Sequence, residues 1–137
     1  MSPAEDFTRR FGEAWSAPTG DRLAALLTED VHLVQPMMRE VHGRDGARRA
    51  FDELFALVPD LRSEVRRFGA TEDGVLIEHT MTGTLGRRPY TWDVVDRLLL
   101  DEGGLARERI AHFDPLPVLA QMLRRPGRIP AALRLLR

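Results

Sequence analysis

The sequence predicts an α+β fold in which three helices precede a four-stranded antiparallel meander. Two observations predict it. Apolar residues recur at helical spacing within the first 58 residues, whereas residues 61–114 alternate between apolar and polar side chains as strands do. Short turns that contain glycine interrupt this alternation three times. A run of helices followed by strands joined through short turns indicates an α+β domain.

The first helix begins at a capping box, Ser2-Pro3-Ala4-Glu5, which places a serine before a proline at the first helical position. Behind it, a helical stripe contains Phe7, Phe11, Ala14 and Trp15. We expect this helix to end near Trp15, because Pro18-Thr19-Gly20 breaks it. Asp21 is expected to cap a second helix whose apolar side carries Leu23, Leu26 and Leu27.

A short strand and a third helix follow. Residues 31–36 read as a strand that ends at a proline, and residues 43–57 read as a helix. The apolar stripe of that helix consists of Ala47, Phe51, Leu54, Phe55 and Val58. The four strands of the meander are expected at residues 61–71, 74–85, 89–101 and 105–114.

Composition excludes several classes of chemistry. The 137 residues are enough for one domain, and a net charge of -1 with 43% hydrophobic residues is typical of a globular protein without a nucleic-acid partner. All 20 basic residues are arginine and cysteine is absent, so Schiff-base lysine chemistry, thiol nucleophiles and Cys-based metal sites are excluded. The polar, acidic N-terminus does not resemble a signal peptide, so a cytoplasmic location is expected.

The C-terminal region differs from the rest. Residues 1–118 are expected to form the domain and residues 119–137 a basic amphipathic helical extension that contains no acidic residue. Its short helices, limited by Pro126 and Pro130, are expected to cover an edge of the core or a partner subunit rather than a membrane surface. Asp114, which precedes Pro115, is expected to cap the first of these helices.

The order of elements and three local segments, residues 27–36, 41–46 and 94–104, resemble the nuclear transport factor 2-like superfamily over residues 4–118. That superfamily includes ketosteroid isomerases, limonene epoxide hydrolases and SnoaL-like polyketide cyclases. The resemblance implies a cone-shaped curved sheet packed against the helices, a mostly apolar pocket, a homodimer and no cofactor.

The same resemblance implies that familiar catalytic groups are missing. Asp96 matches the protonated aspartic acid that donates to the substrate oxyanion in ketosteroid isomerases. The isomerase base corresponds to Gln35, an acid of the epoxide hydrolases to Met81, and the acid of the SnoaL-like cyclases to Ala111. None of these three side chains transfers a proton near neutral pH.

Strand alternation provides a different catalytic hypothesis. His79 and Asp96 each lie on the apolar face of neighbouring strands, so they are expected to approach each other and act as an acid/base pair. Arg109 is expected to meet either an acidic ligand or Asp96. An ion pair with Arg109 would leave Asp96 ionised, whereas without it Asp96 would be a neutral donor, and the sequence leaves both open.

The predicted ligand-binding residues are Gln35, His32, Trp15, Phe55, Met81, Trp92, Arg109 and Phe113. The four histidines show no paired ligand spacing, so no metal site is predicted. Two functions fit. One is a cofactor-independent enzyme that isomerises, cyclises or adds water to an apolar oxygenated molecule. The alternative is a non-catalytic dimeric module that binds a hydrophobic ligand or a partner segment.

Overall fold

The computed structural model describes all residues except 125, 126, 128 and 137. Eleven elements follow one another among the described residues. The helices are α1 (Pro3–Ser16), α2 (Gly20–Ala24), α3 (Arg44–Leu57), α4 (Pro115–Met122) and α5 (Ile129–Leu135). The strands are β1 (Leu27–Val34), β2 (Val41–His42), β3 (Arg62–Ala70), β4 (Gly74–Leu85), β5 (Arg88–Leu100) and β6 (Ala106–His112).

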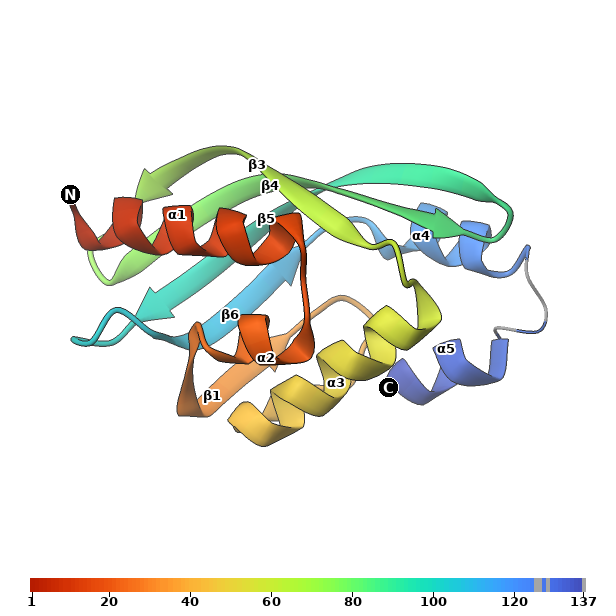
Figure 1. Cartoon of the computed structure of the whole chain (residues 1–137), viewed down its shortest axis with the longest axis horizontal. Coiled ribbons are helices and arrows are strands. Elements are labelled where there is room, and N and C mark those ends of the chain that lie inside the picture. Colours follow the sequence, from red (N-terminus) through yellow and green to blue (C-terminus); the bar gives the residue numbers. More distant parts are fainter. Residues whose placement is uncertain (125–126, 128, 137) are drawn as a thin grey trace.

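The six strands form a single sheet in the order β2-β1-β6-β5-β4-β3. The meander from β3 to β6 is antiparallel, as predicted. However, β1 pairs parallel to β6, so the sheet is mixed rather than wholly antiparallel. Figure 1 shows α1 and α3 lying across the sheet, with α4 and α5 at the end opposite the N-terminus. The predicted α+β class with a curved sheet covered by helices is confirmed.

Burial follows the predicted alternation. On β4, Val75 and Ile77 are buried, and Val94 and Leu98 are buried on β5. Aromatic side chains of α1 pack onto this face, where Phe11 lies 6.3 Å from Trp15 between ring centroids. Each large apolar side chain buried in this way contributes about 1.5–3 kcal/mol to folding before entropy is counted. Any polar side chain that points into this core must therefore find a hydrogen-bond partner there.

The structure corrects three details of the N-terminal prediction. Thr19, not Asp21, caps α2, and its hydroxyl accepts from the amide of Arg22. The helix ends at Ala24, and Leu27 already belongs to β1. Apolar residues in short runs fit helical and strand spacing equally well, which explains this boundary error. The two-residue strand β2 was not predicted, because it is too short to show a period.

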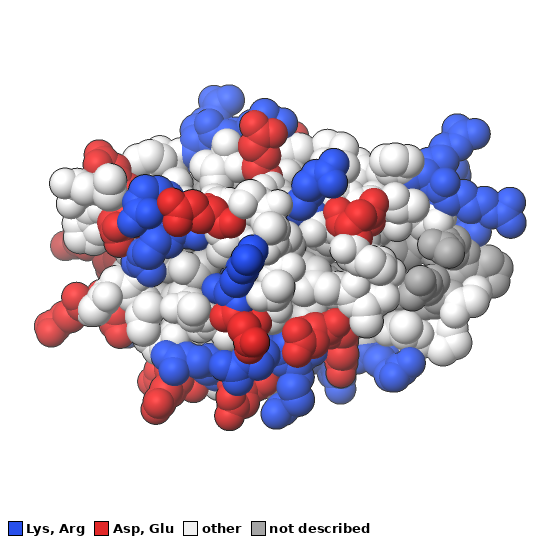
Figure 2. Space-filling model, viewed as in Figure 1, with Lys and Arg blue, Asp and Glu red and all other residues white. Residues whose placement is uncertain are grey.

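Figure 2 shows charges of both signs on the visible face. Arg87 and Arg88, at the β4–β5 turn, lie beside Arg124 of the C-terminal region. No helix in the described part of the chain is both long and apolar enough to cross a membrane. The Asp114 side chain caps α4 by accepting from the amide of Leu116, as predicted.

We predict that Gly74→Ala destabilises the protein by about 1–3 kcal/mol, as overpacking typically does. A methyl group at this position would collide with the backbone carbonyl of Leu98, which cannot move without disturbing the sheet. Gly69→Ala is the matched control, since nothing lies within 4 Å of the added methyl. Urea denaturation of both variants measures the difference, and equal free energies of unfolding would contradict the predicted close approach.

Candidate functional site

A buried polar network spans four adjacent strands. Asp96 on β5 accepts from Arg109 on β6, whose Nε lies 2.9 Å from Asp96 Oδ2. The same oxygen lies 3.2 Å from His79 Nε2 on β4, and His79 Nδ1 lies 2.6 Å from Ser63 Oγ on β3. His79 and Asp96 have no exposed surface. The predicted approach of these two residues is therefore present, and Ser63 and Arg109 extend it on both sides.

Strand register explains how the network assembles. Ile77 pairs with Asp96, and His79 pairs with the next inward-facing residue of β5, Val94. On its other side, β5 pairs with β6, where Asp96 lies opposite Ala111. Arg109 lies two residues before Ala111, so its side chain is on the same face. Side chains two residues apart on paired strands are diagonal neighbours, within reach for long side chains such as arginine and histidine. The small side chain of Ala111 leaves space beside Asp96.

The surroundings of Asp96 favour its ionised form. Burial by itself raises the pKa of the Asp96 carboxyl, but the Arg109 guanidinium and the hydrogen bond from His79 together hold that pKa below its usual range. The ion-pair alternative is therefore favoured over a neutral Asp96 that donates a hydrogen bond. Asp96 Oδ1 is buried without a hydrogen-bond partner among the described residues, so half of the carboxylate remains an unused acceptor.

The hydrogen bonds fix which nitrogen of His79 carries a proton. An ionised carboxylate only accepts, so Nε2 must donate to Asp96. In a neutral imidazole, Nδ1 then accepts from the Ser63 hydroxyl. In an imidazolium, Nδ1 donates to Ser63 Oγ, whose hydroxyl can donate to the Thr80 carbonyl 3.2 Å away. Rotation of one hydroxyl therefore lets the network accommodate an added proton without losing a hydrogen bond.

An apolar cavity of about 100 Å³ lies beside the network, between the sheet, α3 and the C-terminal helices. Arg109 lines the cavity, whereas His79, Asp96 and Ser63 lie behind its wall. The other lining residues are Trp15, Gln35, Pro36, Met37, Met38, Phe51, Leu54, Leu61, Met81, Trp92, Val94, Phe113, Pro115, Val118, Leu119, Met122, Leu135 and Leu136. Arg109 is thus the point where the buried network meets the cavity.

The structure separates the predicted site residues into three groups. Those that line the cavity are Trp15, Gln35, Met81, Trp92, Arg109 and Phe113. His79 and Asp96 form the adjoining network, and their role in catalysis stays a prediction. His32 and Phe55 do not line the cavity. Phe55 packs edge-on against Trp15 at 6.0 Å, and the side chain of His32 hydrogen-bonds Glu40 instead.

Sequence reasoning missed Ser63 and the contribution of the C-terminal extension. Ser63 lies between Leu61 and Val65 on the alternating face of β3, which is the signal that could have identified it. Leu119, Met122, Leu135 and Leu136 of the extension line one side of the cavity. Its end is joined to the segment after β1, because the Arg39 amide donates to the Leu135 carbonyl over 3.1 Å and Met38 forms a bridge with Leu136.

Two of the lining residues carry donors that lack acceptors among the described residues. The one hydrogen bond that the described residues make with the Arg109 side chain uses Nε, which leaves Nη1 and Nη2 for other acceptors. Trp92 Nε1 is buried and has no partner among the described residues. A buried donor without an acceptor costs about 1–3 kcal/mol, which a ligand oxygen can recover. The cavity therefore suits an apolar molecule that carries an acceptor oxygen.

We predict strong coupling between Asp96 and Arg109 in a double-mutant cycle. Asp96→Asn and Arg109→Met should each lower the free energy of unfolding by about 3–5 kcal/mol, because each leaves a buried charge without its partner. The double variant should lose clearly less free energy of unfolding than the two single variants lose together. Urea denaturation measures all three losses.

The exposed pair Arg97–Glu108, at 3.5 Å on the same two strands, is the control for this cycle. Its coupling should stay within about 0–1 kcal/mol, as for other surface pairs. Additive effects of Asp96→Asn and Arg109→Met would show that the buried ion pair does not stabilise the fold.

Comparison with known proteins shows which family this chain belongs to. The model of the SnoaL-like domain matches residues 8–108. A putative SnoaL-like polyketide cyclase from Jannaschia sp. CCS1 is 18% identical, with a TM-score of 0.76 over 88% of this chain and 91% of that chain. TerC, co-crystallized with polyporic acid, is 18% identical, with a TM-score of 0.79 over 89% of this chain and 99% of that chain.

An LEH-like epoxide hydrolase from M. tuberculosis is also 18% identical, with a TM-score of 0.72 over 95% of this chain and 96% of that chain. Similarity at this level of identity establishes a shared fold. No curated protein matches the chain. Because the family model covers most of the chain, from α1 to β6, the protein belongs to the SnoaL-like domain family of the nuclear transport factor 2-like superfamily.

Proposed function

We propose that the cavity binds an apolar, oxygenated small molecule and that Arg109 stabilises negative charge on its oxygen. The observation that carries this proposal is the position of Arg109, the one charged side chain among the described residues that line the cavity. Its Nε is held by Asp96, which fixes the direction of the guanidinium, while Nη1 and Nη2 remain for the ligand. Trp92 Nε1 supplies a second donor.

The reaction that suits this arrangement forms an oxyanion or enolate, as in isomerisation, cyclisation or water addition. Donors fixed before the reaction stabilise developing charge without reorganising, and an apolar surrounding strengthens the interaction. In this proposal Arg109 touches the substrate, and Asp96 is a positioning residue that holds it. His79 donates from Nε2 to the same carboxylate and would help to hold it, and Gln35 would orient the ligand. No cofactor is required.

A non-catalytic binding module is the second candidate, and one observation favours it. Among the described lining residues, three side chains carry polar groups: Gln35, Arg109 and, through its indole nitrogen, Trp92. None of these three groups is a general base. A ligand could therefore bind without being converted. The exposed apolar side chains Leu76 and Val95 share the outer face of the meander and would be covered in the homodimer that this candidate includes.

The test compares apolar carboxylic acids and phenols with their neutral methyl ethers and esters by thermal shift. We predict that acidic ligands raise the melting temperature more than their neutral counterparts, because they pair with Arg109. A ligand at 100 times its Kd stabilises the folded state by about 2.7 kcal/mol, which such an assay resolves. Trp92→Phe, which keeps the ring and removes the donor, should weaken binding.

The control variant Arg97→Met replaces an exposed arginine of β5 outside the cavity. It should bind the acidic ligands as the wild type does. Since Arg109→Met alone strands the Asp96 charge, its effect on binding is measured in the Asp96→Asn background, where the stranded charge is absent. Equal binding of acids and neutral counterparts by the wild type would contradict the proposal. Mass spectrometry of the bound ligand after incubation then separates the two candidates, since only an enzyme returns a changed molecule.

A further inference from the structure

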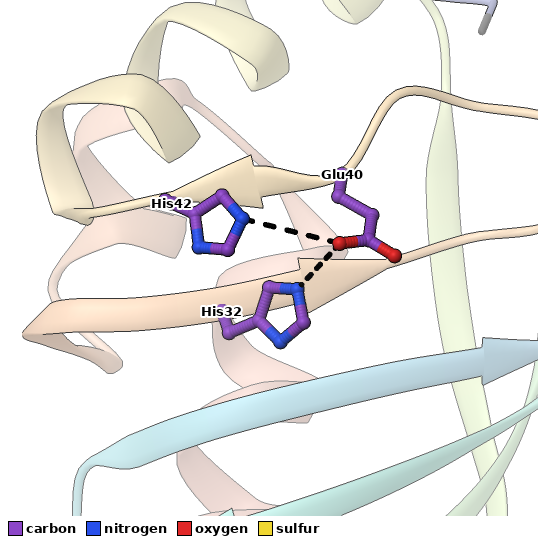
Figure 3. A group of neighbouring side chains, drawn as sticks. All are labelled: His32, Glu40 and His42. Carbon is purple, nitrogen blue, oxygen red and sulfur yellow. Dashed lines mark hydrogen bonds and ion pairs between the residues drawn. The ribbon is translucent and has the colours of Figure 1, made fainter.

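Three side chains with metal-ligating atoms, none of which lines the cavity, converge at the edge of the sheet. His32 on β1 pairs directly with His42 on β2, and their rings stack with centroids 4.5 Å apart and planes 10° from parallel. Glu40, just before β2, brings its carboxylate to the Nε2 edge of both rings. Figure 3 shows Nε2 of each histidine directed at the same carboxylate oxygen of Glu40.

The distances between these atoms approach those in a metal site. Glu40 Oε2 lies 3.1 Å from His32 Nε2 and 3.9 Å from His42 Nε2, and the three ligand atoms all lie within 4.8 Å of one another. Tetrahedral zinc with bonds of about 2.0–2.1 Å holds its ligand atoms about 3.3 Å apart. Small rotations of exposed side chains are enough to close the difference.

The backbone positions of the ligands are already fixed. Val31 and Leu33, on either side of His32, are buried in the core, and the Gly43 amide donates to the Val31 carbonyl over 2.7 Å at the end of β2. Because two of the three ligands lie on paired strands, the backbone loses little conformational entropy when the site binds an ion. The side chains remain open to solvent, with the His42 side chain 74% exposed, so water can complete the coordination.

We propose that His32, Glu40 and His42 bind one divalent transition-metal ion of the zinc class. Two imidazoles and one carboxylate form a ligand set that zinc proteins use together with an open position for water. Imidazole nitrogens favour zinc, nickel and copper over magnesium and calcium, which prefer sites made of oxygen atoms. The site lies outside the proposed ligand cavity, so its existence does not depend on the proposed function.

Metal binding would also fix one wall of the cavity. The ligands His32 and His42 flank the segment 35–38, all of which lines the cavity. Within it, Met37 has a positive φ of 61°, which a non-glycine residue rarely adopts. Closing this segment with an ion between its two ends would restrict its motion, as a loop-closing link does.

The experiment is isothermal titration calorimetry of chelator-treated protein with zinc chloride. We expect one ion per chain, and His42→Ala should weaken binding at least as much as the roughly 10- to 100-fold loss that follows removal of an outer-shell partner. Glu40→Gln should weaken it as well. His112→Ala, which removes an exposed histidine of β6, is the matched control and should bind as the wild type does.

Circular dichroism confirms that each variant is folded, which is expected because the His42 side chain makes few contacts at its exposed position. In parallel, zinc should shift the imidazole NMR signals of His32 and His42 and leave those of His79 unchanged. Absence of binding to the wild type, or equal affinity of wild type and His42→Ala, would overturn the proposal. Shifts confined to His112 would overturn it too.

Discussion

Asp96 is a carboxylate without exposed surface in the middle of an apolar sheet face, and its charge has to be balanced there. Transfer of an unpaired carboxylate into such a surrounding is so unfavourable that the group normally takes up a proton instead. Here Arg109 and His79 approach the same oxygen, at 2.9 and 3.2 Å, and hold the pKa of Asp96 below its usual range despite burial. The balance depends on β4, β5 and β6 keeping their register, because a shift by one residue would turn these side chains to opposite faces.

This constraint connects the fold to the cavity. A buried ion pair contributes little to stability compared with apolar packing, so its presence in the core calls for another explanation. Arg109 gives one, because it is both the partner of Asp96 and the charged residue of the cavity wall. In our account the pair places a fixed positive charge at the end of an apolar space. The C-terminal extension covers another side of this cavity through Leu119, Met122 and Leu135.

Much of this arrangement could be predicted from the sequence. A period of two in 74–85 and 89–101 is enough to place His79 and Asp96 on one face, and the resemblance to the superfamily gave the fold. What local patterns could not supply is register and pairing between distant segments. The parallel contact of β1 with β6 joins residues about 76 positions apart, such as His32 and Glu108, and nothing in either segment specifies the other. The His32–His42 pair depends on β2, whose two residues show no period. Whether Asp96 is neutral or ionised depended on an arginine 13 positions away.

The charge state of Asp96 tests the account most directly. With ¹³C-labelled aspartate, the carboxyl resonance of Asp96 can be assigned by its loss in Asp96→Asn and followed as the pH is lowered. We predict that Asp96 is ionised at neutral pH and stays so until the pH falls below the ordinary aspartate value of 3.8. The stability that its ionised form contributes should then disappear as the pH falls through this lowered pKa. An Asp96 carboxyl that is protonated at neutral pH would contradict the account, and would restore the neutral donor as its role.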